Sequence, residues 1–186
     1  MSRASDSFAQ SIQDSENLLA HFNALNSKPP PPQLEVLKRA GLIMAMTAWE
    51  TYVEDRVLEA TFERLRGSQD STLAEFFLSR LKEDVAKLNN PTSAKTLQLF
   101  RDYAGVDVGD RWSWNNHDKE MVRTRLNAYL KLRGDVVHRS RAVEPGPPKA
   151  HAVTRHELKR AISFLKCLVQ ATELALDTAA AQVGPS

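Results

Sequence analysis

The sequence predicts an all-α protein, an antiparallel up-and-down helical bundle with additional helices. Apolar residues recur at helical spacing, and no segment alternates between apolar and polar residues as a half-buried strand would. Only seven glycines occur among the 186 residues, of which 42% are hydrophobic and 26% charged, ordinary values for a globular protein. A chain of this length fits one domain with a sizeable core.

The N-terminal part predicts two helices separated by prolines. Apolar spacing indicates a first helix over about residues 5–25, and the four prolines at 29–32 end it. The proline run forms a stiff linker, or else a ligand for a proline-binding partner. A long second helix over about residues 34–66 carries two adjacent apolar stripes. A helix that is apolar over so wide an arc is central to a bundle or contacts a second subunit.

Two shorter helices and a loop are expected next. Thr72 and Glu75 have the spacing of a capping box that opens a third helix, to about residue 88. A fourth helix covers about residues 93–104. A loop with Trp112 and Trp114 follows.

The C-terminal part predicts two more helices. The fifth covers about residues 118–138, and a proline-rich loop follows it. Thr154 and Glu157 form a second capping box, at the start of a last helix over about residues 154–180. The expected organisation is an N-terminal helix with its proline-rich linker (1–33), a helical bundle (34–180) and a tail (181–186).

Several classes of protein are disfavoured by what the sequence lacks. The polar N-terminus resembles no secretory signal, and the longest uncharged apolar run, residues 40–49, is too short to span a bilayer, so a cytoplasmic protein is expected. Cys167 is the sole cysteine, which excludes an internal disulfide. The histidines show no zinc or di-iron spacing, and no glycine-rich phosphate loop occurs, so we expect neither a metal nor a cofactor.

The fifth helix contains an unexpected charge in the stretch YLKLRGDVVHRS, residues 129–140. On a helical wheel, Arg133 falls near the centre of an apolar face. An unpaired guanidinium there would cost several kcal/mol, so it must meet an anion or border a cleft. Glu50 and Glu54, one turn apart on the long helix, are both candidate partners for a buried ion pair.

His138 has two interpretations. It lies ~140° from Arg133 on an unbroken helix, among the basic residues Lys131, Arg139 and Arg141. It is therefore either a solvated residue at a helix end or part of a site. Asp135 is three residues before it and could orient the imidazole, or could pair with Arg139 on the surface.

The pattern Arg-x4-His, Arg133 to His138, resembles the signature of the HEPN superfamily. The order of the helix RAGLIMAMTAWETYVEDRVLEA, a tryptophan-containing loop and the helix with LRGDVVHR is similar to its RiboL-PSP branch. The similarity covers most of residues 34–175. One departure is visible, because the family usually has a polar residue, often Asn, directly after the Arg, where this chain has Gly134.

The resemblance implies a HEPN-like four-helix core with additional helices, and a homodimer whose motifs face a shared cleft. It implies a metal-independent endoribonuclease, a toxin or defence effector, with Arg133 and His138 as catalytic residues and an antitoxin protein as a further partner. Asp135 and Glu50 would support them. Lys131, Arg139 and Arg141 would bind RNA. The alternative is a HEPN module that has lost catalysis and only binds RNA or a protein.

The residue types suit RNA cleavage without a metal. A histidine titrates near neutrality, so it can take the proton of the 2′-hydroxyl or protonate the leaving oxygen. An arginine can bind the phosphate through two N–H groups. For one chain to bring both side chains to one phosphate, Gly134 must break the helix; otherwise a second subunit must supply one of them. Trp112 and Trp114 either stack on bases or fix their loop to the core.

Overall fold

The computed structural model describes residues 2–27, 31–66, 70–139 and 153–182; the side chains of His138 and Arg139 lie outside this description. Within these residues every regular element is helical, so the all-α prediction is confirmed. The main helices are α1 (Arg3–Leu25), α2 (Glu35–Leu65), α3 (Ser71–Ala86), α4 (Ser93–Leu99), α5 (Lys119–Arg139) and α6 (Arg155–Gln182). Short turns of other helix types are η1 (Pro32–Leu34), η2 (Phe100–Ala104) and η3 (Val108–Arg111).

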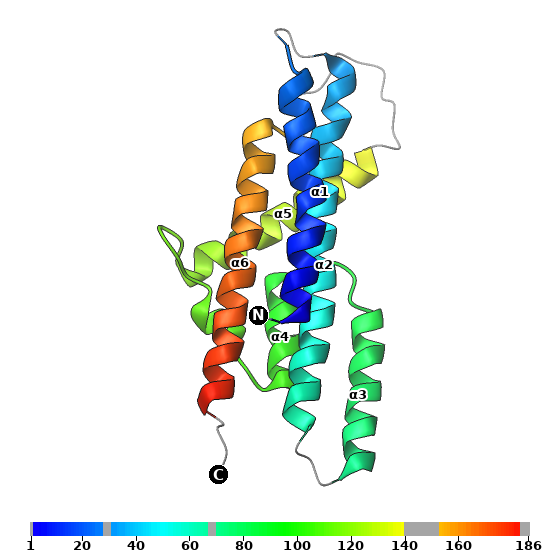
Figure 1. The fold of residues 1–186 in the computed structure, drawn as a ribbon, viewed down its shortest axis with the longest axis vertical. Coiled ribbons are helices and arrows are strands. Elements are labelled where there is room, and N and C mark those ends of the chain that lie inside the picture. The colour runs from blue at the N-terminus through cyan, green and yellow to red at the C-terminus, as the bar shows by residue number, and fades with distance from the viewer. Residues whose placement is uncertain (1, 28–30, 67–69, 140–152, 183–186) are drawn as a thin grey trace.

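Helix α2 lies at the centre of the molecule. It runs antiparallel to α1, and α6 runs alongside both (Figure 1). Helices α3 and α5 and the turn η2 also contact α2. One part of the apolar arc of α2 is covered by elements of its own chain, since side chains such as Trp49, Val53 and Val57 are fully buried. The adjacent apolar stripe stays partly exposed: Ile43 and Leu58 are only partly buried, and Val36 is 51% exposed.

Close packing of three helices occurs at Gly41 in α2. A Cβ atom there would lie 2.8 Å from a methyl group of Leu158 in α6. The hydroxyl of Ser15 in α1 donates to the carbonyl oxygen of Gly41 at 2.7 Å. Glycine therefore lets α6 pack closely, and any larger residue would force the Leu158 side chain to shift.

A buried polar cluster joins the other ends of the same helices. One carboxylate oxygen of Glu173 in α6 accepts from Tyr52 (2.7 Å), Arg56 (2.9 Å) and Ser2 (3.0 Å). Burial, followed by the Glu173 charge, raises the pKa of Tyr52 well above its ordinary value. The charge of Glu173 is thus neutralised by Arg56 and satisfied by donors from α2 and from the N-cap of α1.

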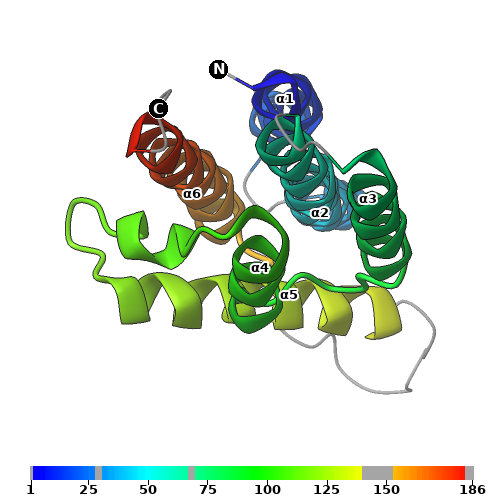
Figure 2. The ribbon, with the colours of Figure 1, turned by 90° about the horizontal axis from the view of Figure 1, so that it is seen from below.

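Helix α5 lies along one side of the bundle, transverse to α2 and α6 (Figure 2). Val122, Leu126 and Leu130 are buried against the core, whereas Lys131 is exposed. Among the described helices, none combines the length and the apolar character needed to cross a membrane. Because α5 crosses α2, Arg133 lies beside the middle part of α2.

Candidate functional site

Arg133 forms an ion pair within its own chain. Its Nη1 lies 2.7 Å from Oε2 of Glu50 on α2, and the two side chains are 19% and 22% exposed. Of the two carboxylates that the sequence offered, Glu50 is the partner. The position of Arg133 in an apolar face is therefore explained by a partly buried charge pair, which removes the cost of an unpaired guanidinium.

Asn90 completes the contacts of this pair, and the sequence reasoning missed it. Nη2 of Arg133 donates to Oδ1 of Asn90 at 3.2 Å, and the backbone N–H of Asn90 donates to Oε1 of Glu50 at 3.0 Å. Asn90 has φ of 61°, a left-handed conformation that asparagine tolerates better than most residues. The dipeptide Asn90-Pro91 was the available signal, because it is typical of a turn.

The segment that carries Asn90 is anchored on both sides. The indole N–H of Trp49, the residue before Glu50, donates to the carbonyl oxygen of Pro91 at 3.4 Å. On the α5 side, Oδ1 of Asn127 accepts from the backbone N–H of Ser93 at 2.9 Å, and its Nδ2 donates to the Ser93 hydroxyl at 3.0 Å. Arg133 is thus held by a turn fixed between α2 and α5.

Glu54, one turn from Glu50 on α2, is influenced by neighbouring carboxylates, and among the described residues it forms no ion pair. Burial, together with the charges of Glu50 and Asp55, raises the pKa of Glu54 above its ordinary value of 4.5. A guanidinium has five N–H groups, and two of its nitrogens are used by Glu50 and Asn90. With 19% of its side chain exposed, Arg133 retains donors that an anion could reach.

Helix α5 continues through Gly134 to Arg139 without a break. The hypothesis that Gly134 breaks the helix is therefore wrong. A Cβ atom at this position would meet no other atom within 4 Å, so neither packing nor backbone geometry requires glycine. The angular separation of Arg133 and His138 on the helix, ~140°, is consequently retained.

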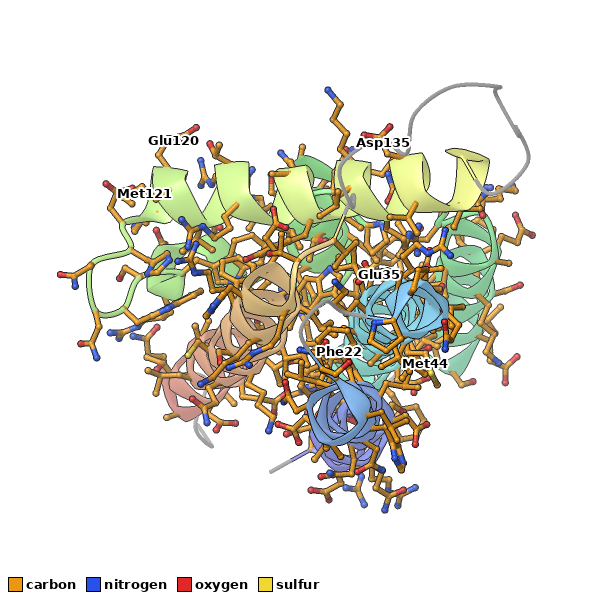
Figure 3. The ribbon with its side chains drawn as sticks, turned by 90° about the horizontal axis from the view of Figure 1, so that it is seen from above. Phe22, Glu35, Met44, Glu120, Met121 and Asp135 are labelled. Carbon is orange, nitrogen blue, oxygen red and sulfur yellow. The ribbon has the colours of Figure 1, made fainter. Side chains whose placement is uncertain are left out.

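The other predicted site residues are distributed over the end of α5. Lys131 is exposed, and Asp135 is partly exposed and points away from the bundle (Figure 3). His138 lies in the helix, but its side chain and that of Arg139 are outside the described residues, as is Arg141 altogether. The orientation of His138 by Asp135 and the grouping of the basic side chains stay predictions.

Comparison with known proteins gives one match. Residues 10–178 match the RiboL-PSP-HEPN family, which is a member of the HEPN superfamily. This chain belongs to that family. The match extends beyond the 34–175 of the sequence resemblance and includes most of α1. No curated protein and no solved structure matches the chain.

In this RiboL-PSP-HEPN chain the two tryptophans of the loop differ in environment. Trp112 is fully buried, and its indole N–H donates to the Thr172 hydroxyl of α6 at 3.0 Å. It fixes the loop to the core, so base stacking is excluded at Trp112. Trp114 is only partly buried and stacks on His117, with ring centroids 5.5 Å apart.

Within the described part of this HEPN chain, no group of three or more His, Cys, Asp or Glu side chains is placed to hold a metal ion. The candidate site consists instead of a guanidinium group whose position is fixed by neighbouring side chains. Glu50 and Asn90 fix the guanidinium of Arg133 at the surface of α5, five residues before His138.

Proposed function

We propose that the protein is a metal-independent endoribonuclease of the HEPN type, acting as a toxin or defence effector in the cytoplasm. The observation that carries the proposal is Arg133, held by Glu50 and Asn90 on the helix that also bears His138, in a chain of the RiboL-PSP-HEPN family. Arginine and histidine at this spacing supply a phosphate ligand and a proton-transfer group.

The proposed reaction is transfer of the phosphoryl group to the neighbouring 2′-hydroxyl. The 2′-oxygen forms a bond to phosphorus while the bond to the 5′-oxygen breaks, giving a 2′,3′-cyclic phosphate and a 5′-hydroxyl. A base takes the 2′-hydroxyl proton and an acid protonates the 5′-oxygen; His138 is suited to either step. Arg133 stabilises the additional negative charge on the phosphate oxygens.

The contact with Glu50 fits a positioning function. Glu50 and Asn90 restrict the rotamers of Arg133, so less conformational entropy is lost when a phosphate binds. Lys131 on the exposed side of α5, with Arg139 and Arg141, would attract the RNA backbone.

A homodimer is part of the proposal. Arg133 and His138 diverge by ~140° on an unbroken helix, so one chain does not easily direct both side chains to the same phosphate. A second subunit would supply the missing group across a shared cleft. An antitoxin protein that covers this cleft would be the natural inhibitor.

Two observations favour the alternative, a HEPN module that binds RNA or a protein without cleavage. The guanidinium of Arg133 is already neutralised by Glu50 at 2.7 Å. Gly134 also takes the place where the family usually has a polar residue. A purely structural ion pair would have the same geometry.

The test is incubation of the purified protein with total RNA, with and without EDTA. The proposal expects cleavage that EDTA does not prevent, products with 2′,3′-cyclic phosphate ends, and loss of cleavage in His138→Ala. Complete inhibition by EDTA that Mg²⁺ reverses would reject this mechanism. RNA binding without cleavage would favour the alternative.

A further inference from the structure

Two adjoining hollows lie at the N-terminal end of α5, apart from the Arg133 site. They are shallow and widely open to solvent, with volumes of about 590 and 570 Å³, and both are lined by Asp118 and Met121. Met121 stands out from the helix next to Glu120 (Figure 3) and is 45% exposed. The hollows form one groove between α5, the N-terminal part of α6 and the Trp114 turn, which we call the α5–α6 groove.

Aromatic rings form part of the groove. Trp114 and His117 line one hollow and stack at 5.5 Å with an interplanar angle of 24°. Tyr129 lines the other hollow. Phe164 of α6 connects them from beneath, with its ring 5.6 Å from Trp114 and 5.5 Å from Tyr129. The groove therefore has an apolar, aromatic wall supported by the core.

Two guanidinium groups line the groove, and among the described residues neither forms an ion pair. They are Arg125 and Arg160. Nη1 of Arg125 lies 3.1 Å from Nε2 of His117, whose Nδ1 is 3.2 Å from the carbonyl oxygen of Asn115. Both contacts are satisfied when the neutral imidazole carries its proton on Nδ1. His117 then holds Arg125 by a neutral acceptor, which leaves the positive charge of Arg125 uncompensated.

Both arginines act on one phenol. Burial raises the pKa of Tyr129, the charges of Arg125 and Arg160 oppose this increase, and the smaller influence of the Glu157 charge adds to it. The two guanidinium groups and the Glu157 carboxylate therefore face the same part of the groove.

Three carboxylates line the groove, and two of them accept hydrogen bonds from backbone N–H groups. The third, Glu120 in the first turn of α5, is exposed and lies 3.9 Å from Arg123. Asp118 accepts from the backbone N–H of Met121 at 2.8 Å, at the start of α5. Glu157 accepts from the backbone N–H of Thr154 at 2.9 Å in the capping box of α6. Helix N-termini compensate such negative charges, which reduces their repulsion of a bound anion.

Helix α5 connects this groove with Arg133. Arg125, Tyr129 and Arg133 follow each other at intervals of four residues, so they form one row on the helix over about 12 Å. A strand that binds at Arg133 can continue along this row to the groove.

We propose that the α5–α6 groove binds a nucleotide of single-stranded RNA, with its phosphate on Arg125 and Arg160 and its base against Trp114, His117 and Met121. Proteins bind single-stranded nucleic acid with cationic groups that contact the phosphates and aromatic rings that stack on the bases. Any base can stack on such a ring. The inference rests on the proposed function in that the same strand would reach Arg133, but binding at the groove does not require cleavage.

The experiment measures binding of a short fluorescein-labelled single-stranded RNA by anisotropy, with full-length protein carrying His138→Ala to prevent cleavage. Arg125→Gln and Arg160→Gln are each expected to weaken binding roughly tenfold. Each should also reduce the slope of log Kd against log salt by about 0.7, the loss of one phosphate contact. Lys159→Gln is the matched control, because Lys159 is exposed beside Arg160 on α6 but does not line the groove. Its effect should stay within about twofold.

Tryptophan fluorescence gives a second reading at the groove itself. Trp49 and Trp112 are fully buried, so quenching by added RNA should come from Trp114 and disappear in Trp114→Phe. The inference is overturned if RNA binds equally to Arg125→Gln, Arg160→Gln and Lys159→Gln, or if the protein binds no single-stranded RNA. If the wild type cleaves RNA and the Arg125→Gln and Arg160→Gln variants bind RNA as well as the wild type does, only the proposed groove is rejected. Groove-dependent binding by a protein that never cleaves would reject the proposed activity alone.

Discussion

Arg133 contacts Glu50 and Asn90, so its replacement removes structural contacts as well as a cation. Arg133→Ala leaves the Glu50 carboxylate partly buried without its partner. We expect the free energy of unfolding to fall by about 1–3 kcal/mol, less than for a fully buried pair because both side chains retain some exposure. Urea denaturation of both single mutants and of Arg133→Ala with Glu50→Ala should reveal a coupling of about 1 kcal/mol. Additive effects would show that the pair contributes nothing.

At Gly134 a substitution should raise stability rather than lower it, because nothing in the structure requires glycine there. It lies within α5, and an added methyl group meets no atom within 4 Å. Gly134→Ala should raise the free energy of unfolding by about 0.5–1 kcal/mol through the higher helix propensity of alanine. RNA cleavage should be retained. A variant that is more stable but inactive would indicate that the site needs a bend at Gly134.

Asn90 and Asn116 form a matched pair, because both are non-glycine residues with positive φ, 61° and 62°. Glycine relieves the backbone strain at either position, so Asn116→Gly should change stability by only a few tenths of a kcal/mol. Asn90→Gly should cost about 1 kcal/mol more, because it removes a partly buried hydrogen bond to Arg133. Only Asn90→Gly removes an acceptor from Arg133. We therefore expect Asn90→Gly to lower kcat for RNA cleavage. Asn116 lines the α5–α6 groove, so Asn116→Gly can change RNA binding but should leave kcat at saturating RNA unchanged. Equal kcat values for the two variants would exclude a positioning function for Asn90.

Helix α2 places Glu54 one turn after Glu50, and Glu54 forms no ion pair with any residue that the structure describes. Its folded-state pKa is raised above 4.5, so folding favours its protonated form. The stability contribution of that proton is present below pH 4.5 and is lost as the pH rises through the folded pKa. Glu54→Gln should therefore melt at a higher temperature than the wild type at pH 7.

The control for Glu54 is the pH dependence of that difference. The two melting temperatures should converge as the pH is lowered towards 4.5, where Glu54 itself becomes protonated. A difference that is constant across this range would assign the effect to the amide rather than to the charge.

At the level of elements, helical periodicity predicted the helices well. The predicted spans 5–25, 34–66 and 118–138 agree closely with α1, α2 and α5. The capping box of Thr154 and Glu157 is confirmed by reciprocal hydrogen bonds of 3.1 and 2.9 Å. The predicted box at Thr72 was wrong, because Asp70 caps α3 by accepting from the N–H of Leu73. Asp70 was not considered as a cap from the sequence, although aspartate is also a favoured N-cap residue.

The candidate site was less accessible to sequence reasoning. The helical wheel placed Arg133 in the apolar face of its helix, and the sequence offered Glu50 and Glu54 as its two candidate partners. It could not find Asn90, since that contact depends on a turn held between α2 and α5 by Trp49 and Asn127. Such contacts arise from tertiary packing and have no fixed sequence spacing.

For the whole molecule, the partial covering of α2 by its own chain changes the argument for a dimer. One apolar stripe of α2 is buried by its own chain, whereas the adjacent stripe is partly exposed, with Val36 at 51% and Phe62 at 59%. The wide apolar arc alone therefore does not decide for a second subunit. The proposal of a shared site rests on α5, whose unbroken course separates Arg133 and His138 by ~140°.

The most direct measurement of this central claim mixes two inactive variants, Arg133→Ala and His138→Ala, with subunit exchange verified by tags. If each site takes Arg133 from one subunit and His138 from the other, a mixed dimer has one intact site. The mixture should then recover roughly a quarter of the wild-type RNA cleavage, because half of the dimers are mixed and each has one of two sites intact. No recovery in verified mixed dimers, or cleavage by a protein that light scattering shows to be strictly monomeric, would contradict the shared site.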